Sequence, residues 1–155
     1  MSHNLAKMIL NKLNENIVVI GKTGTGKSTL ILNAKIPDSK YFDFVELTKN
    51  DNPPGSPHFL CEENYLHFEP DLLNTPEKTI ILDYVCFPLN LQDSRLMHLI
   101  DTIRKHDKRL IIVAYPEPEY ADMSLFRYGE KFGAIIQLDK DGDYFICDVE
   151  MKGVK

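Results

Sequence analysis

Residues 17–29 read Ile17-Val18-Val19-Ile20-Gly21-Lys22-Thr23-Gly24-Thr25-Gly26-Lys27-Ser28-Thr29. Four β-branched apolar residues lead into a glycine-rich turn, and helix-compatible residues follow the turn. From Gly21 to Ser28 the turn has the spacing G-x-x-x-x-G-K-S, which is typical of a loop that holds phosphate groups. The sequence therefore predicts a buried strand, a phosphate-binding loop and a helix in direct succession.

The chemistry of this loop follows from its residue types. Gly21, Gly24 and Gly26 carry no Cβ, so the backbone can turn tightly and direct its N–H groups inward. The positive end of the following helix is aimed at the same place, so an anion of triphosphate size is held by amides and dipole together. Lys27 can reach the β- and γ-phosphates, and Ser28 can offer its hydroxyl to Mg²⁺. A glycine-rich surface turn without a ligand is the alternative, and the flanking strand and helix argue against it.

Composition narrows the class of protein. The chain has 155 residues, of which 43% are hydrophobic and 26% charged, and we expect one domain over residues 1–155 with its own core. No segment resembles a signal peptide or a membrane span, and Cys61, Cys86 and Cys147 form no disulfide or metal pattern. The expected location is therefore the cytoplasm. A formal net charge of −5 argues against binding by general attraction to a phosphate backbone.

Hydrophobic periodicity predicts alternating helices and strands. Leu5, Met8, Ile9 and Leu13 have helical spacing and predict a buried stripe on a helix over residues 2–14. Alternation of strands with helices implies a mainly parallel sheet with crossover helices. The further expected helices cover 27–34, 91–106 and 122–131, and the expected strands cover 17–20, 41–47, 79–83, 110–114, 134–138 and 144–149.

Two segments offer candidate metal ligands. His58, Cys61 and His67 fall in a long irregular region over residues 48–78, but they lack the close pairs that metal sites use, so ordinary loop residues are favoured. The second segment leads into the last predicted strand. It places carboxylates at the ligand spacing of a calcium loop, namely Asp139, Asp141, Asp143 and Glu150. Tyr144 stands where that loop needs glycine, and strands flank it, so a β-hairpin is favoured.

A basic run closes the clearest predicted helix. It consists of Arg104, Lys105, His106, Lys108 and Arg109. A solvated helix end that complements the helix dipole explains the run, and a patch that contacts DNA or phosphate is the alternative.

Asp83 ends a second informative segment, Thr79-Ile80-Ile81-Leu82-Asp83. An apolar strand that ends in a carboxylate suits the centre of a parallel sheet. In proteins with a phosphate-binding loop such an aspartate lies beside the loop and holds Mg²⁺ through water. The alternative is an aspartate that caps the end of a strand.

Together, Gly21–Ser28 and Ile80–Asp83 resemble the Walker A and Walker B motifs of P-loop NTPases. The resemblance covers about residues 15–138 and implies a three-layer α/β fold, with a mainly parallel sheet between helices, followed here by a C-terminal β-hairpin. It also implies that ATP and Mg²⁺ are bound, with Ser28 and Asp83 on the metal and Lys27 on the developing charge. The implied nucleotide-binding residues are Gly21, Lys22, Thr23, Gly24, Thr25, Gly26, Lys27, Ser28 and Thr29. The segment from Thr102 to Ala114 is similar to the helix and strand of FtsK–HerA-type DNA-translocating and packaging ATPases.

The sequence departs from those ATPases in three places. Tyr84 stands directly after Asp83, where a glutamate is common, and Tyr115-Pro116 replaces a polar sensor at the end of the next strand. No obvious arginine finger is visible, and Arg127 and Arg104 are the candidates for one. Glu46 is the candidate base that orients water or an acceptor, because it lies near the carboxyl end of the second strand. Glu117, past the end of the third of the predicted buried strands, competes for this role, and a solvent-facing Glu46 without a role remains the alternative.

These features favour an Mg-dependent ATPase that acts on a nucleic-acid or protein partner. A small P-loop kinase that transfers the γ-phosphate to an acceptor is one alternative, and a nucleotide-binding assembly protein with little turnover is another. The missing glutamate after Asp83 favours the second alternative. The sequence leaves open whether the chain forms a homo-oligomer, such as the rings of translocating ATPases.

Overall fold

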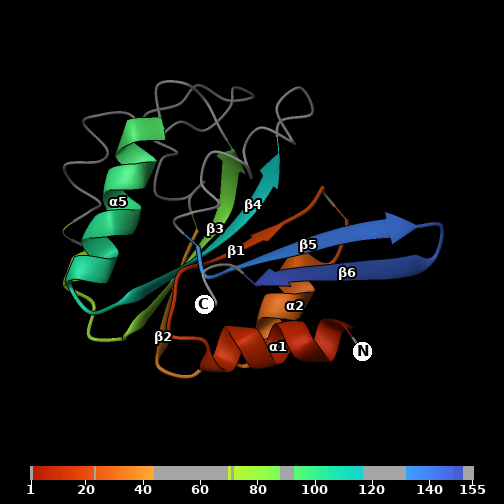
Figure 1. Cartoon of the computed structure of the whole chain (residues 1–155), viewed down its shortest axis with the longest axis horizontal. Coiled ribbons are helices and arrows are strands. Elements are labelled where there is room, and N and C mark those ends of the chain that lie inside the picture. Colours follow the sequence, from red (N-terminus) through yellow and green to blue (C-terminus); the bar gives the residue numbers. More distant parts are fainter. Residues whose placement is uncertain are drawn as a thin grey trace.

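A six-stranded sheet forms the centre of the computed structural model, which describes residues 2–22, 24–43, 70, 72–87, 93–116 and 132–151. The strand order is β2-β3-β4-β1-β5-β6, and all neighbours pair in parallel except β5 and β6 (Figure 1). The strands are β1 (Ile17–Ile20), β2 (Ser39–Asp43), β3 (Thr79–Phe87), β4 (Arg109–Pro116), β5 (Ala134–Asp141) and β6 (Tyr144–Met151). The helices are α1 (Ser2–Lys12), α2 (Lys27–Ala34) and α5 (Asp93–Lys105).

Helices cover both faces of this sheet, as Figure 1 shows. On one face, apolar side chains of α5 pack against alternate residues of the central strands, including Val18, Leu82 and Ile112. On the other face, α1 and α2 pack against the intervening residues, including Val19 and Val113. The period of two in a strand therefore sends successive side chains into two separate cores. This three-layer α/β arrangement confirms the fold class predicted from the sequence.

The order of the strands positions the loop after β1. β4 lies between β1 and β3, and β5 lies on the other side of β1. The four residues of β1 are all buried, which explains why they are continuously apolar rather than alternating. One strand, β4, therefore separates β1 from the strand that carries Asp83.

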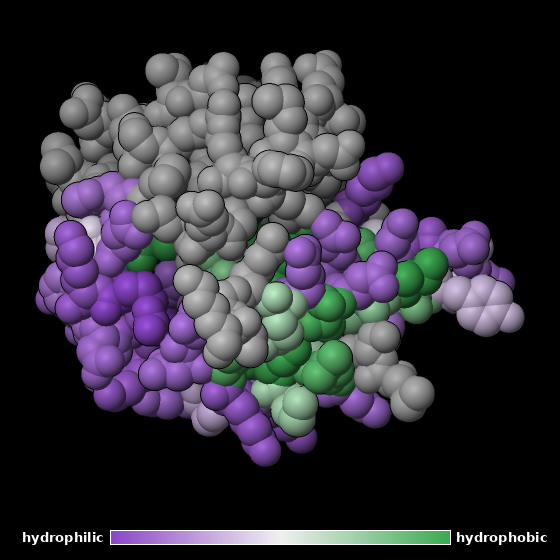
Figure 2. Space-filling model, in the orientation of Figure 1, coloured by the Kyte–Doolittle hydropathy of each residue, from purple (hydrophilic) through white to green (hydrophobic). Residues whose placement is uncertain are grey.

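The buried face of α1 differs from the predicted stripe. Leu5 and Met8 are 43% and 49% exposed, and apolar surface gathers over α1 and the nearby hairpin in Figure 2. The side chains that α1 buries are Ala6, Ile9, Leu10 and, in part, Leu13. The stripe is therefore rotated, because the small Ala6 faces the sheet and Asn11 Nδ2 donates to the Ala34 carbonyl at the end of α2 (2.7 Å). The helix itself, predicted over 2–14, is confirmed.

Several predicted boundaries are confirmed or extended. The helix predicted over 27–34 has those bounds, and Lys35 follows it in the left-handed conformation, two residues before Pro37. In the region predicted to be irregular, the Asn74 N–H donates to the Pro70 carbonyl, and Leu72 is buried in the core beneath α5. His58, Cys61, His67 and the helix predicted over 122–131 lie outside the described residues.

The C-terminal strands form the predicted hairpin. β5 and β6 pair antiparallel from Ala134 with Met151 to Asp141 with Tyr144, which leaves the two-residue turn 142–143. Gly142 has a φ of 59°, which a glycine adopts without strain. The calcium-loop alternative is wrong, because the segment forms two paired strands: Asp139 and Asp141 lie on β5, Asp143 in the turn and Glu150 on β6. No group of three or more His, Cys, Asp or Glu side chains that could hold a metal ion occurs in the part of the chain that the structure describes.

Arg109 joins α1 to the strands at the edge of the sheet opposite the loop that follows β1. Its side chain is 6% exposed and donates to the carbonyls of Leu13 (2.6 Å) and Leu10 (2.5 Å) and to the hydroxyl of Thr79 (2.8 Å). The last carbonyls of a helix have no partner within it, and they form the negative end of its dipole. The guanidinium therefore joins the end of α1 to β3 and β4, although burial lowers the pKa of Arg109.

The basic run around Arg109 is partly used by the fold. Besides Arg109, Lys108 Nζ donates to the carbonyls of Thr75 (2.6 Å) and Glu77 (2.7 Å). These contacts weaken the nucleic-acid interpretation of the run, because two of its cations hold the chain's own carbonyls.

None of the helices in the described ranges is long and apolar enough to span a membrane.

Replacing Arg109 with methionine tests whether these hydrogen bonds stabilise the fold. Arg109→Met keeps most of the aliphatic length but leaves the Leu10 and Leu13 carbonyls without their donor. We expect the free energy of unfolding to fall by about 2–4 kcal/mol, since each unsatisfied buried acceptor costs about 1–3 kcal/mol. Chemical denaturation measures the change, with Arg104→Met, at an exposed position on α5, as the control. Equal stability of the two variants would contradict the assignment.

Candidate functional site

The loop that follows β1 leaves the middle of the carboxyl edge of the parallel strands. Gly21 N–H donates to the Ala114 carbonyl of β4 (3.2 Å), so the first residue of the loop still follows the sheet. Ligands of open parallel sheets bind at this edge. The loop is therefore anchored on buried strands and leads directly into α2.

The three glycines of the loop are needed for steric or conformational reasons. A Cβ on Gly21 would lie 2.6 Å from the Leu138 carbonyl oxygen and 2.6 Å from Thr25 Oγ1, so a side chain there would collide with β5. Gly24 and Gly26 have φ angles of 83° and 92°, which other residues adopt only with strain. The predicted requirement for glycine at these three positions is confirmed.

The first turn of α2 faces the loop. Gly26 stands at the N-cap without a side-chain cap, and its carbonyl accepts from Leu30 N–H (2.9 Å). The first N–H groups of a helix have no carbonyl partner within it, so those of Lys27, Ser28 and Thr29 are available to an anion. Ser28 and Thr29 are exposed at this end, and Thr25 closes the turn by donating its hydroxyl to the Lys22 carbonyl (2.7 Å).

Lys27 curls back over the loop. Its Nζ donates to the carbonyls of Gly21 (2.5 Å) and Lys22 (2.9 Å). Burial lowers the pKa of Lys27, and the negative charge of Asp83 acts in the opposite direction. The ammonium group thus lies within the curve of the loop and within electrostatic reach of Asp83.

Asp83 lies on the same face of the sheet as the loop helix. Its side chain is 2% exposed, and Oδ2 accepts a hydrogen bond from the Tyr41 hydroxyl of β2 (2.5 Å). Ile81, two residues earlier, packs in the core beneath α1 and α2, so the alternation of β3 turns Asp83 toward that side as well.

The strand does not end at Asp83, contrary to the prediction. β3 continues to Phe87, and its register with β4 shifts between Leu82 and Val85, so that Asp83 and Tyr84 together lie opposite Val113. Such a bulge re-aims side chains and is common beside functional sites. Asp83 is therefore placed by a local irregularity, not by the end of a strand.

The structure brings together most of the predicted site residues. Lys27, Ser28 and Asp83 gather at one edge with the loop glycines, whereas Thr23, Glu46, Glu117 and Arg127 lie outside the described residues. Arg104 is in the last turn of α5, close to the start of β4. From Arg109 to Ala114 the strand rises by about 16 Å, so Arg104 lies at the opposite edge and cannot serve the loop of its own chain.

Tyr41 is the site residue that sequence reasoning missed. It was assigned only to a strand, and its spacing from Asp83 carries no motif. No sequence signal marks it, because its place depends on the pairing of β2 with β3, in which Tyr41 pairs with Ile81 and Asp43 with Asp83. Tyr41 lies two residues before Asp43, the residue that pairs with Asp83. Its side chain is therefore on the same face of the sheet and can reach Asp83.

The oxygen donors at this edge fit Mg²⁺. Ser28 supplies an exposed hydroxyl and Asp83 a buried carboxylate, and hard oxygen ligands are those that Mg²⁺ prefers. Mg²⁺ is usually held by one or two protein groups together with waters and substrate phosphates. The described residues offer such a sparse set.

Removing the Tyr41 hydroxyl tests the geometry around Asp83. Tyr41→Phe deprives a buried carboxylate of a donor, so we expect the free energy of unfolding to fall by about 1–3 kcal/mol. Tyr144→Phe is the matched control, because Tyr144 is 79% exposed and should change stability by less than about 0.5 kcal/mol. Denaturant titration of both variants measures the difference, and a neutral Tyr41→Phe would show that the hydrogen bond holds nothing in place.

Comparisons with known proteins give no family by sequence. The chain matches no protein-family model, and no curated protein matches it. Solved structures do match. The KaiC-like protein PH0186 from the archaeon Pyrococcus horikoshii OT3 aligns with 90% of this chain and 79% of its own, with a TM-score of 0.54 and 11% identity.

A second solved structure is DnaA from Aquifex aeolicus bound to AMPPCP. It aligns with 89% of this chain, with a TM-score of 0.52 and 17% identity, and this chain spans 45% of the DnaA chain. The flagellar accessory protein FlaH from Methanocaldococcus jannaschii aligns with 98% of this chain at 15% identity, with a lower TM-score of 0.48. At these identities the likeness to PH0186 and DnaA shows a shared architecture, so this chain has the mainly parallel, helix-flanked α/β fold of those proteins.

Proposed function

We propose that this chain binds Mg-ATP on the loop Gly21–Ser28 and hydrolyses it. The observation that carries the proposal is the meeting of three groups at one sheet edge: the glycine loop with the first turn of α2, the Lys27 ammonium, and the buried Asp83 carboxylate. The choice of ATP is supported by DnaA, a protein of the same fold that was solved with AMPPCP, an ATP analogue.

Each group has a distinct task in this proposal. The N–H groups of the loop and of the first helical turn hold the phosphate oxygens. Lys27 leaves the Gly21 and Lys22 carbonyls and stabilises the charge that develops on the γ-phosphate. Ser28 and Asp83 hold Mg²⁺, which when bound neutralises phosphate charge. Tyr41 keeps the Asp83 carboxylate in one orientation.

The residue that orients the attacking water is proposed from the sequence. Tyr84 follows Asp83 and is a poor base near neutral pH, since a phenol titrates near ~10. β2 ends at Asp43, the register partner of Asp83, and Glu46 follows three residues later along the chain. Glu46 is therefore our candidate, with Glu117 as its competitor, and both lie outside the described residues.

A nucleic-acid or protein partner would couple this hydrolysis to work. The resemblance of residues 102–114 to FtsK–HerA-type ATPases supports a nucleic acid, while the net charge of −5 and the engagement of Lys108 and Arg109 within the fold oppose a broad basic surface. The second candidate function is a nucleotide-binding assembly protein with little turnover, and Tyr84 after Asp83 favours it. A phosphate-acceptor kinase has no such supporting observation.

Binding is tested with Lys27→Ala. The variant removes the ammonium from the loop while leaving the core intact, so we expect Mg-ATP affinity to fall below detection and the thermal midpoint to change little. Isothermal titration calorimetry measures the affinity. Lys12→Ala, at an exposed position in the last turn of α1, is the control and should bind as the wild type does. Unchanged affinity in Lys27→Ala would refute the proposal.

Turnover is tested by phosphate release with Mg²⁺ present. Asp83→Asn removes the charge that holds the metal and should lose most Mg²⁺-dependent turnover.

Glu46→Gln should lower turnover by ~10²-fold or more while ATP still binds, as loss of a general base does. Full activity of Glu46→Gln with loss in Glu117→Gln moves the role to Glu117. A wild type that binds ATP but releases no phosphate, with or without DNA, favours the assembly protein.

A further inference from the structure

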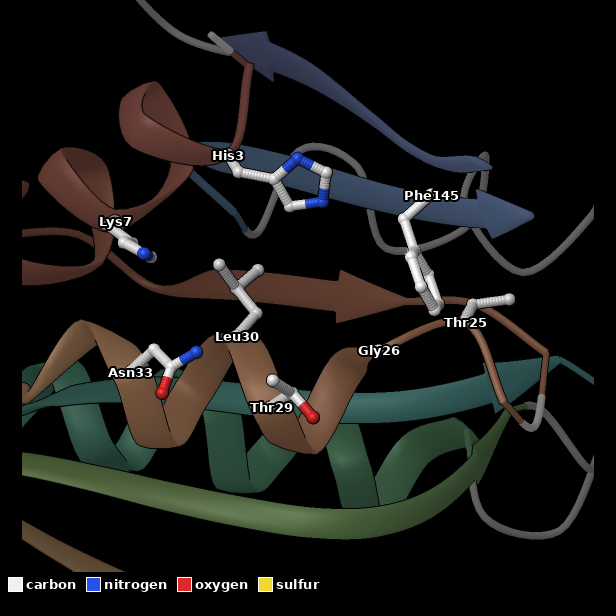
Figure 3. Close-up of a pocket in the computed structure, with 8 residues that line it drawn as sticks. All are labelled: His3, Lys7, Thr25, Gly26, Thr29, Leu30, Asn33 and Phe145. Atoms are coloured by element: carbon white, nitrogen blue, oxygen red, sulfur yellow. The ribbon is translucent and has the colours of Figure 1, made fainter. Parts of the chain in front are cut away.

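A cavity of about 320 Å³ opens beside the phosphate-binding loop (Figure 3). This volume lies at the lower end of the roughly 300–1,000 Å³ that small-molecule sites occupy. Three elements form its walls: α1, α2 and the β5–β6 hairpin. Beyond the loop itself, the lining side chains are His3, Lys7, Thr29, Leu30, Asn33 and Phe145.

The cavity is continuous with the loop. Thr25 and Gly26 belong to the loop and also line the cavity, and Thr29 lies in the first turn of α2 that faces the anion site. A molecule in this cavity would therefore lie beside whatever is held on the loop. The two spaces suit two ends of one ligand.

The strand order indicates the direction in which such a ligand would extend across the loop. Asp83 is on β3, two strands from β1 on one side, and Phe145 is on β6, two strands from β1 on the other side. With strands about 4.8 Å apart, each lies about 10 Å from the line of β1. A phosphate chain that meets Lys27 and Asp83 at one end leaves the loop toward the cavity at the other end.

The walls suit a flat, partly polar group. The Phe145 ring is 52% exposed and lines the cavity, and its Cδ1 and Cε1 lie 3.7 and 3.9 Å from the place where a Cβ on Gly26 would be. Lys140 Nζ lies over one face of the ring, 5.2 Å from its centroid. Leu30 adds an apolar wall, and Figure 3 shows the polar ends of His3, Lys7 and Asn33 around the same space.

We propose that this cavity holds the nucleoside of the nucleotide, with its base against Phe145. The inference rests on the proposed function, since the loop must hold the phosphates. It assigns to α1 and the C-terminal hairpin a task that the phosphate loop does not have, which is to recognise the base and ribose. Aromatic rings bind bases by stacking, and the amide of Asn33 offers both a donor and an acceptor to a base edge.

The experiment compares a whole nucleotide with its phosphates alone. Calorimetry with Mg²⁺ measures the affinity of the full chain for inorganic tripolyphosphate and for ATP and GTP, and the tighter of the two nucleotides is then used. Phe145→Ala should weaken binding of that nucleotide about tenfold or more, because stacking on an aromatic ring contributes about that much, and should leave tripolyphosphate affinity unchanged. Phe145→Leu keeps the apolar bulk of the hairpin but lacks the ring, and it should lose most of the same affinity.

Tyr144→Ala is the matched control. Tyr144 is the neighbouring residue of β6 and is 79% exposed, and alternation along the strand directs it to the opposite face from Phe145. Binding of both ligands should be unchanged in this variant, and circular dichroism verifies that each variant is folded.

The outcomes separate this inference from the function on which it rests. Wild type that binds neither ligand refutes the proposed function and the cavity assignment with it. Wild type that binds tripolyphosphate as tightly as the nucleotide leaves the loop assignment standing and overturns the cavity assignment. Unchanged nucleotide affinity in both Phe145 variants, or an equal loss for both ligands, also overturns it.

Discussion

The buried guanidinium of Arg109 is the contact on which the arrangement around the site depends. It donates to the Leu10 carbonyl in the last turn of α1, to the Leu13 carbonyl just after the helix and to Thr79 on β3, so one charge joins α1 to two central strands. A buried charge without hydrogen bonds would be costly, but here the negative end of a helix surrounds it. Because His3 and Lys7 lie on that same helix, a contact at one edge of the sheet positions a wall of the cavity at the other.

The two edges of the sheet are built by different means. At the edge of Arg109, polar groups are buried and paired; Asn16, for example, accepts from the Leu110 N–H (2.8 Å) and, through its carbonyl, from the Gly133 N–H (2.8 Å). At the loop edge, the chain uses glycines with positive φ and a bulge at Asp83. Irregular backbone persists where the surrounding structure holds it in place, and here the paired strands β1, β3 and β4 do so.

Local signals explain why part of this structure could be predicted from the sequence. The strand, loop and α2 were predictable because β-branched residues, glycines and a G-K-S end lie next to one another in the chain. The bulge at Asp83 was not, because a bulge is a property of two paired strands and only the register with β4 defines it. The buried face of α1 depended on whether Ala6 or Leu5 met the sheet, which hydrophobic spacing alone cannot distinguish. Tyr41 and Phe145 reach the site through tertiary contacts, so no spacing marks them.

Lys27 bonds to the backbone of its own loop. Its ammonium already holds two carbonyls of the loop, so a ligand must exchange internal hydrogen bonds for new ones and does not simply add to them. Net gains in such exchanges are small for each bond, about 0.5–1.5 kcal/mol. Under the proposed function, a ligand with few oxygens would recover little, whereas a chain of phosphates would replace both carbonyls and engage the helix end as well. The hydrogen bonds that Lys27 makes within the loop would therefore favour, in the proposed binding, ligands with several phosphate groups.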